Sequence, residues 1–434
     1  MLGLWFLVLL LVAFDGFVPL EAALAPHGWD CISCPSNSML AGNWDVNNPN
    51  FNNTDLWWAE TITSSYAAVA LNMNSANTSV TVEHARIMKK LNPHFKFLVY
   101  QNSELGPLTK ESKQIIDAHP EWWCRDDDDV PLSTVQGYKL NMSRADVRSW
   151  YNNYPLHVFG EDAEELLDGL LSDSMGYSPG WLKNTNQARY DAFFQGKMAL
   201  GDEGRAIYSK LNGGEVWAND ALDVIDQYNK VAYNHSLVKW NTALDHVDVG
   251  FLEGAGSFWY DNHTTGEWIP EFFELFLESV INASTAGKTV VLHFSPGPSM
   301  VPLLSFPQNA TPAYNKFLAL TWQGPAKTPL TADGVRQAAA DVLVQALAPF
   351  LIVANERVFL QYAWFYELQD GNIPCPSGIE CGMPSSWYPE FSKPLGAPKA
   401  PAVKNGPIWT RAFANAEVYV DVRSRSASKI TWHS

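Results

Sequence analysis

Two carboxylates in this sequence, Asp173 and Glu253, each close an apolar run that predicts a buried strand. The runs are 169–173 (GLLSD) and 247–253 (VDVGFLE). No metal-binding motif or phosphate loop accompanies them in the sequence. A pair of acids alone is the set that hydrolysis of a glycosidic bond requires. One acid protonates the leaving oxygen, while the other attacks the anomeric carbon or activates water.

Asp168 and Asp248 stand at the opposite ends of the same two runs. A separation of five residues turns them to the other face of an ideal strand, so we expect them to support the fold. For any single carboxylate, a helix cap or an ion pair is the competing explanation. The agreement between the two runs favours a shared catalytic role for Asp173 and Glu253.

Apolar, β-branched runs recur along the chain and predict eight strands. They cover residues 67–72, 95–101, 138–142, 169–173, 215–219, 247–253, 289–294 and 357–364. Segments with helical character lie between most of them, at residues 82–91, 144–158, 162–167, 188–211, 221–239, 270–284 and 334–347. Apart from a longer final gap, strand starts lie about 30 to 45 residues apart, which is typical of parallel βαβ units. Eight such units predict an α/β fold, the (β/α)8 TIM barrel.

A doubly wound sheet is the alternative fold, but it usually opens with a glycine-rich phosphate turn, and no predicted strand is followed by one. After residue 369 the composition changes. Residues 370–407 are rich in Pro, Gly and Ser, and residues 408–434 alternate like short strands. The expected organisation is therefore a barrel over 26–369, a loop over 370–407 and a small C-terminal β appendage over 408–434.

The active site of such a barrel lies at the carboxyl ends of its strands. Asp173 would end the fourth strand and Glu253 the sixth. The candidate substrate-binding residues near these strand ends are Tyr100, Asn102, Tyr177, Trp217, Asn219, Asp220, His293 and Trp364. Aromatic rings suit the apolar faces of sugars, and 18 of the 434 residues are tryptophan. A place in the core is the competing explanation for any one of these rings, and for His293.

The N-terminus predicts secretion. Residues 2–14 (LGLWFLVLLLVAF) form an apolar run that is too short to cross a bilayer and is typical of a signal-peptide core. We therefore expect residues 1–25 to be a signal peptide, with a signal anchor as the alternative, and the mature protein to be extracellular or in the secretory lumen. Glycosylation is predicted at the sequons of Asn52, Asn77, Asn234, Asn262, Asn282 and Asn309. Asn141 also begins a sequon, which conflicts with its place at the end of the predicted third strand.

Five cysteines are present in a chain that we expect in an oxidising compartment. Cys375 and Cys381 are predicted to form a local disulfide. Cys124 is expected to pair with Cys31 or Cys34. No metal and no cofactor is expected, and the acidic run 126–129 lacks the spaced ligands and the glycine of a calcium loop. The net charge of −17, without a basic cluster, argues against nucleic acid and anionic membranes as partners.

Four segments together resemble a family of TIM-barrel glycoside hydrolases. They are 119–151 (HPEWWCRDDDDVPLSTVQGYKLNMSRADVRSWY), 166–177 (LLDGLLSDSMGY), 247–258 (VDVGFLEGAGSF) and 409–422 (WTRAFANAEVYVDV). The resemblance covers residues 60 to 425 approximately, and it implies a TIM barrel with Asp173 and Glu253 as the catalytic pair. The sequence SDSMG replaces the family's bulkier FLDN, so the family's substrate is not carried over. A distant similarity to retaining endo-fucanases adds a sulfated fucan as a candidate substrate.

The sequence therefore predicts a secreted glycoside hydrolase that cleaves a polysaccharide or glycan, with Asp173 as nucleophile and Glu253 as general acid/base. Two alternatives stay open. One is a catalytically inactive barrel that binds glycans through its tryptophans. The other is a polysaccharide lyase, for which His293 is the available base.

Overall fold

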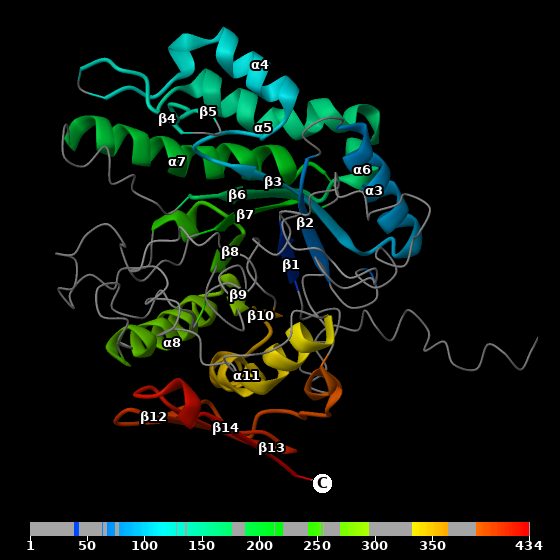
Figure 1. Cartoon of the computed structure of the whole chain (residues 1–434), viewed down its shortest axis with the longest axis vertical. Helices are drawn as coiled ribbons and strands as arrows, with labels where there is room; N and C mark the ends of the chain where they lie inside the picture. The colour runs from blue at the N-terminus through cyan, green and yellow to red at the C-terminus, as the bar shows by residue number, and fades with distance from the viewer. Residues whose placement is uncertain are drawn as a thin grey trace, which may run out of the picture.

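A parallel sheet of eight strands organises the chain, which is described from a computed structural model (Figure 1). Its strand order is β1-β2-β3-β6-β7-β8-β9-β10. The strands are β1 Met39–Gly42, β2 Ala68–Asn72, β3 Lys96–Asn102, β6 Gly169–Asp173, β7 Glu215–Asn219, β8 Val249–Leu252, β9 Thr289–Phe294 and β10 Val358–Tyr362. The structure describes residues 39–42, 63, 67–73, 78–126, 128–134, 137–175, 187–211, 213–219, 242–252, 255, 270–294, 332–362 and 388–433. The two edge strands, β1 and β10, approach each other.

Helices follow most of the strands and pack on one face of the sheet. They are α3 Ser79–Leu91, α5 Ala145–Phe159, α6 Ala163–Leu166, α7 Gln187–Tyr208, α8 Pro270–Thr285 and α11 Ala332–Val353. Figure 1 shows α5 and α7 along β3, β6 and β7, and α8 and α11 beside β9 and β10. Each predicted helix within the described residues is confirmed, and 221–239 lies outside them. No helix among the described residues is both long and apolar enough to cross a membrane.

Alternating side chains give the sheet two apolar faces. Outward residues such as Phe97, Leu170 and Val216 join a large cluster with the helices. Inward residues form a second buried cluster, made of Ala68, Ala70, Leu98, Leu171, Trp217, Val249, Phe251, Val291 and Phe359. All nine lie on strands β2 to β10 of the parallel sheet. The inner face of the sheet is therefore covered by a buried cluster of its own side chains.

Seven of the eight predicted strands are confirmed, and the prediction for 138–142 is wrong. That segment hydrogen-bonds outside the parallel sheet: the Leu140 N–H donates to the Glu104 carbonyl at 2.7 Å, and the Asn141 N–H to the Trp122 carbonyl at 2.8 Å. Its apolar alternation arises because Leu140 and Met142 are buried in the outer core. The missing eighth strand is the short β1, which the sequence did not predict. The conflict at Asn141 is resolved, since this residue ends no strand of the parallel sheet.

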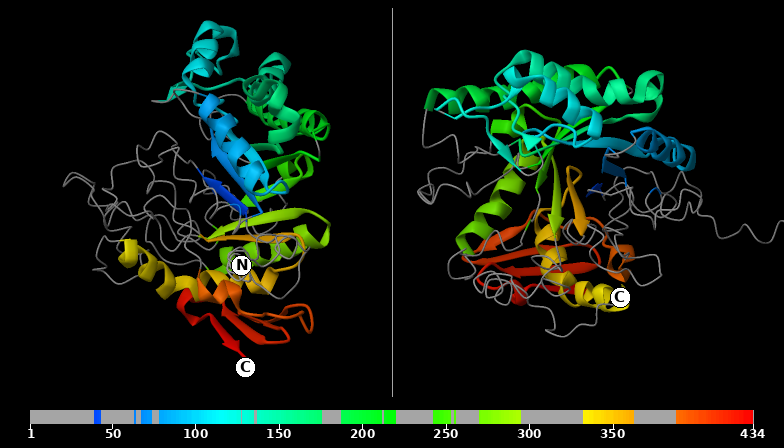
Figure 2. Two further views of the ribbon diagram at one scale, coloured as in Figure 1. Left: turned by 90° about the vertical axis from the view of Figure 1, so that its right-hand side faces the viewer. Right: turned by 45° about the horizontal axis from the view of Figure 1, so that its top comes forward.

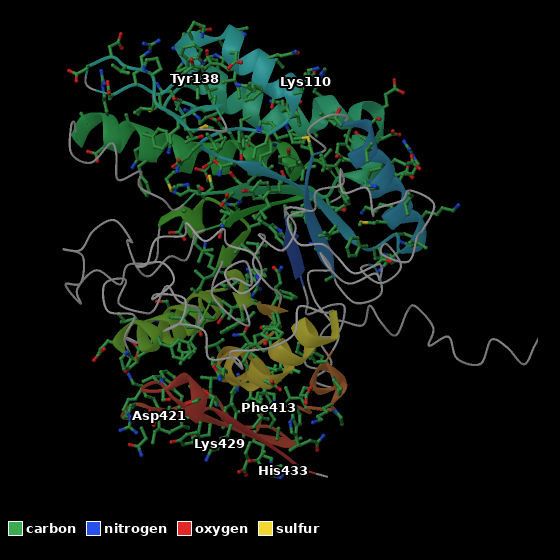
Figure 3. All side chains as sticks on the ribbon, in the orientation of Figure 1. Lys110, Tyr138, Phe413, Asp421, Lys429 and His433 are labelled. Carbon is green, nitrogen blue, oxygen red and sulfur yellow. The ribbon has the colours of Figure 1, made fainter. Side chains whose placement is uncertain are left out.

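An insertion between β3 and α5 carries the segment 138–142. It contains helix α4 (Lys110–Ala118), the 3-10 turn η1 (Pro120–Trp122) and a hairpin of β4 (Ser133–Thr134) with β5 (Gly137–Tyr138). Figure 3 labels Lys110 and Tyr138 on this insertion, at the top of the view and opposite the C-terminal segment. The rings of Trp123 and Tyr138 stack with centroids 3.8 Å apart, and this stack joins η1 to the hairpin.

The C-terminal segment forms an antiparallel sheet of β11 Val403–Asn405, β12 Ile408–Ala412, β13 Ala416–Asp421 and β14 Lys429–Trp432. Figure 2 shows this sheet against α11, away from α4, and Figure 3 labels Asp421 and Lys429 on it. The Arg411 guanidinium on β12 donates to the carbonyls of Leu351, Ile352 and Ala354 at the end of α11. Burial lowers the pKa of Arg411 to about 10. Because this value is still well above 7, the guanidinium stays charged at neutral pH. Arg411 thus satisfies carbonyls that a helix end leaves unpaired.

The parallel strands are tied together at their amino ends by two carboxylates. Asp168 precedes β6 and accepts the Phe97 N–H of β3 at 2.6 Å, and it pairs with Lys89 of α3 at 2.5 Å. Asp248 precedes β8 and accepts the Val216 N–H of β7 at 2.9 Å. Both carboxylates therefore have the supporting role that their sequence positions predict.

Replacement of Asp168 by Ala is expected to lower the free energy of unfolding by about 2–4 kcal/mol, because it leaves Lys89 and a strand N–H without this partner. Urea denaturation of the purified protein measures the loss. The control is Glu83→Ala, which breaks an exposed ion pair with Arg86 and should cause no measurable loss. Equal destabilisation by the two substitutions would contradict this role of Asp168.

Candidate active site

Polar side chains converge where β3, β6 and β7 end. The parallel register pairs Asn102 with Asp173, and Asn219 ends the next strand. Tyr100 lies two residues before Asn102, on the same inward face. Four residues that the sequence predicted for the site, Tyr100, Asn102, Asp173 and Asn219, are therefore neighbours in the structure.

Four donors bind the Asp173 carboxylate. The Tyr100 hydroxyl and the Asn102 amide, at 3.0 Å, donate to Oδ2. The Asn219 amide, at 2.8 Å, and the Ser174 backbone N–H, at 2.7 Å, donate to Oδ1. All four donors are uncharged, and the Asp173 side chain is only partly buried. The arrangement fixes the direction of a carboxylate that stays reachable from the carboxyl edge of the sheet.

Asn102 is itself held in one orientation. Its Oδ1 accepts the backbone N–H groups of Glu104 at 2.9 Å and Leu105 at 3.1 Å. An amide oxygen that accepts two N–H groups leaves the amide nitrogen to donate, which here points at Asp173. The turn after β3 therefore determines which group Asp173 meets.

The turn after β6 fixes Asp173 from the other side. Ser174 adopts a positive φ of 60°, which is uncommon for a residue other than glycine. The Ser103 N–H donates to the Asp173 carbonyl at 3.0 Å, and the Met175 N–H donates to the Asn219 carbonyl at 3.2 Å. Backbone hydrogen bonds to both neighbouring strands thus hold the turn that carries Asp173.

A buried ion network lies behind this turn. Glu104 accepts from Lys139 at 2.6 Å and from Lys197 at 3.2 Å. Burial alone would raise the pKa of Glu104, but the two ammonium groups hold it below its usual value. The sequence prediction missed Glu104, Lys197 and Ser174. A lysine inside the apolar helical segment FFQGKMAL was the available signal for Lys197.

Trp217 was predicted to bind substrate, but its ring is not exposed as stacking on a sugar would require. Its side chain is fully buried in the inner cluster, and its indole N–H donates to Glu215 at 2.9 Å. It lies on the same face as Asn219 but one layer deeper in the interior. Trp217 is a core residue in this structure, and its large ring fills the floor beneath the polar strand ends.

His293 lies on the inward face of β9, fully buried, with its ring stacked on Phe251 at a centroid distance of 6.0 Å. It pairs in register with Gln361 of β10. The predicted residues Glu253, Tyr177, Asp220, Trp364, Cys375 and Cys381 lie outside the described residues, as do the sequons of Asn52, Asn77, Asn234, Asn262 and Asn309. Asn282 is exposed on α8, and its glycosylation stays a prediction.

Metal binding has no support in the described part of the chain, where no group of three or more His, Cys, Asp or Glu side chains could hold an ion. The carboxylate of Asp126 in the acidic run instead accepts the backbone N–H groups of Asp128 and Val130. This pattern is that of a turn.

Comparisons with known proteins give distant structural similarity alone. No known protein family matches the chain, and no similar curated protein is found. Among solved structures, the chain is similar to an α-galactosidase from Geobacillus stearothermophilus, with 13% identity, a TM-score of 0.29, and coverage of 42% of this chain and 27% of that one. It is also similar to an Anoxybacillus α-amylase, with 7% identity, a TM-score of 0.42 and 94% of each chain covered. A fungal β-1,4-galactanase shares 12% identity, with a TM-score of 0.40, over 83% of this chain and 97% of that one.

These three names are those of glycoside hydrolases, and the chain spans 27% of the length of the α-galactosidase. Similarity at these identities and TM-scores carries no argument about substrate or mechanism.

Cys124 corrects an expectation about disulfides. It is a free thiol in the structure, with its side chain buried in the outer core, so a second sulfur could reach it only by entering that core. Burial raises the pKa of Cys124 to about 11. The thiolate, which is the reactive form, is therefore scarce at neutral pH.

Cys124 in the native protein should resist alkylation by iodoacetamide at pH 8, where a pKa near 11 leaves about 0.1% thiolate. Peptide mapping by mass spectrometry measures the modified fraction. The control is the protein unfolded in guanidinium without reductant, in which Cys124 should be fully alkylated. If Cys124 in the unfolded protein reacts only after reduction, it is in a disulfide and the assignment is incorrect.

Proposed function

We propose that this protein is a secreted glycoside hydrolase whose parallel sheet closes into a (β/α)8 barrel. The observation that carries the proposal is the Asp173 carboxylate, which four uncharged donors hold at the carboxyl edge of the sheet. Secretion rests on the apolar run 2–14 in the sequence. A polysaccharide or glycan is the proposed substrate class.

Two observations support closure of the barrel. The inner cluster is built from strand residues, as expected when a sheet curls around and buries its inner face against itself. The edge strands β1 and β10 also approach each other. Side chains fill the interior of such a barrel, so substrate would bind above Trp217 and Leu171, among the loops that follow the strands.

Glu253 is the proposed partner of Asp173. In the sequence it directly follows Leu252, the last residue of β8, and comes two residues after the inward-facing Phe251. Continued alternation would turn Glu253 toward the interior. One strand, β7, separates β6 from β8, so the two backbones should be about 10 Å apart, and side chains that converge on the interior are closer. This spacing is compatible with a pair of cooperating carboxyl groups.

The proposed mechanism retains the anomeric configuration. Asp173 attacks the anomeric carbon and forms a glycosyl ester, while Glu253 gives its proton to the leaving oxygen. Glu253 then removes a proton from water, and the water oxygen attacks the anomeric carbon and releases Asp173. Tyr100, Asn102 and Asn219 keep the carboxylate aimed without supplying a charge that would neutralise it.

Asp173→Asn and Glu253→Gln should each lower kcat by more than about 1,000-fold, because each removes a group that makes or breaks a bond. The assay measures new reducing ends on a panel of polysaccharides and glycans. Melting temperatures should stay within a few degrees of the wild type.

Matched controls are Asp168→Asn and Asp248→Asn, at the amino ends of the same two strands. They should lower the melting temperature and keep kcat. Wild-type turnover by both Asp173→Asn and Glu253→Gln would contradict the site. Saturable binding without new reducing ends would indicate a glycan-binding barrel, and unsaturated products that absorb in the ultraviolet would indicate a lyase.

The first product released from an active substrate should have the anomeric configuration of the bond that is cleaved. Proton NMR during the first minutes of hydrolysis, before mutarotation, measures this configuration. Retention corresponds to carboxyl groups about 5 Å apart, and inversion to about 6.5–9.5 Å. An inverted product would therefore replace the nucleophile role of Asp173 with that of a general base.

A further inference from the structure

Lys197 is a lysine whose side chain is completely buried. It projects from α7, and its Nζ donates to the Ser174 carbonyl at 2.5 Å and to Glu104 Oε1 at 3.2 Å. The Phe193 ring lies 5.1 Å from the same ammonium group. Removing an ammonium group from water is costly unless it is paired, so its partners must be held in place.

The two polar partners of Lys197 flank Asp173. Ser174 follows it directly and supplies its backbone N–H to Asp173 Oδ1. Glu104 lies in the turn after β3, where its own N–H donates to Asn102, the residue that binds Asp173 Oδ2. One ammonium group therefore anchors the turns on both sides of the carboxylate.

Geometry on α7 supports this arrangement. Gly196, beside Lys197, lies so close to the insertion that an added Cβ would come within 2.1 Å of the Met142 carbonyl oxygen. Only glycine permits this approach of α7. Lys139 binds the second oxygen of Glu104, so Glu104 and Asp173 are matched in charge by Lys139 and Lys197.

We propose that Lys197 is a positioning residue for Asp173, acting through the Ser174 carbonyl and Glu104, an inference that rests on the proposed hydrolase function. It holds the positive-φ turn at Ser174, which directs the Asp173 carboxylate into the interior. Lys197 does not touch the substrate, so its loss should misalign the attack and leave substrate binding nearly intact.

Lys197→Met should lower kcat by about 100-fold, the scale expected when a reacting group is displaced by about 1 Å, with KM changed less than about threefold. A second variant guards against misfolding. Glu104→Gln combined with Lys197→Met removes the charges of the Glu104–Lys197 pair, and the remaining Lys139 is partly exposed to solvent, so the variant should fold while the Ser174 carbonyl stays unanchored. Its kcat should be as low as that of Lys197→Met.

The matched control is Lys89→Met, which removes the lysine that pairs with Asp168 at the other end of β6. It should lower the melting temperature and leave kcat unchanged. If neither Lys197→Met nor the double variant folds, Lys197→Gln keeps a polar group in the same place, but its shorter, neutral side chain cannot hold both the Ser174 carbonyl and Glu104, so it should lower kcat with KM retained.

Wild-type kcat in the double variant, or in Lys197→Gln when that variant decides, overturns the inference. So does an equal loss of kcat in Lys89→Met. If Asp173→Asn is inactive while the double variant is active, the positioning role alone fails. If the wild-type protein hydrolyses no glycan, the proposed function fails and the positioning role fails with it.

Discussion

The alternation of side chains along parallel strands is the constraint on which this structure depends. In β6, Leu170 packs outward against the helices, whereas Leu171 packs inward against the other strands. The two leucines are followed by Ser172, which bonds the Tyr151 hydroxyl of α5 at 2.9 Å, and by Asp173, which takes the inward position. A shift of one residue would bury this carboxylate under the helices and turn Ser172 to the inward face. The strand register, with Ser172 bonded to Tyr151 on the helix side and Asp173 bonded to Asn102 and Asn219 on the inner side, therefore specifies where the carboxylate points.

The carboxylates at the two ends of β6 have different partners and different roles. Asp168 accepts a hydrogen bond from a strand N–H and forms an ion pair with Lys89, so its negative charge is neutralised within the fold. Within the described part of the chain, Asp173 accepts hydrogen bonds from uncharged donors only, and Lys197 of α7 binds the Ser174 carbonyl instead. The same residue type thus stabilises the sheet at one edge and keeps an available charge at the other. This division is what makes Asp168 a fair control for Asp173.

Much of this could be predicted from the sequence because strand and helix periodicity are local. Two errors in the predicted strands occurred, and they compensate. The segment 138–142 has a strand-like pattern because it packs outside the sheet through Leu140, and the four residues of β1 are too few to show a pattern. One strand was therefore added before Asp173 and one was missed, so Asp173 keeps its place on the fourth strand. The insertion with α4 was not predicted, because the Trp123–Tyr138 stack and the bond from the Leu140 N–H to the Glu104 carbonyl join residues that are distant in the sequence.

The support of the site depends on contacts that local patterns do not encode. Lys197 follows Ser174 by 23 residues and Glu104 by 93, and its charge is tolerated only because both lie within reach of one ammonium group. Gly196 contributes through a close approach to Met142, which becomes visible only when α7 is packed. A catalytic carboxylate can be inferred from its place at a strand end. The groups that aim it are distributed over a turn, an insertion and a helix, and they meet only in the folded chain.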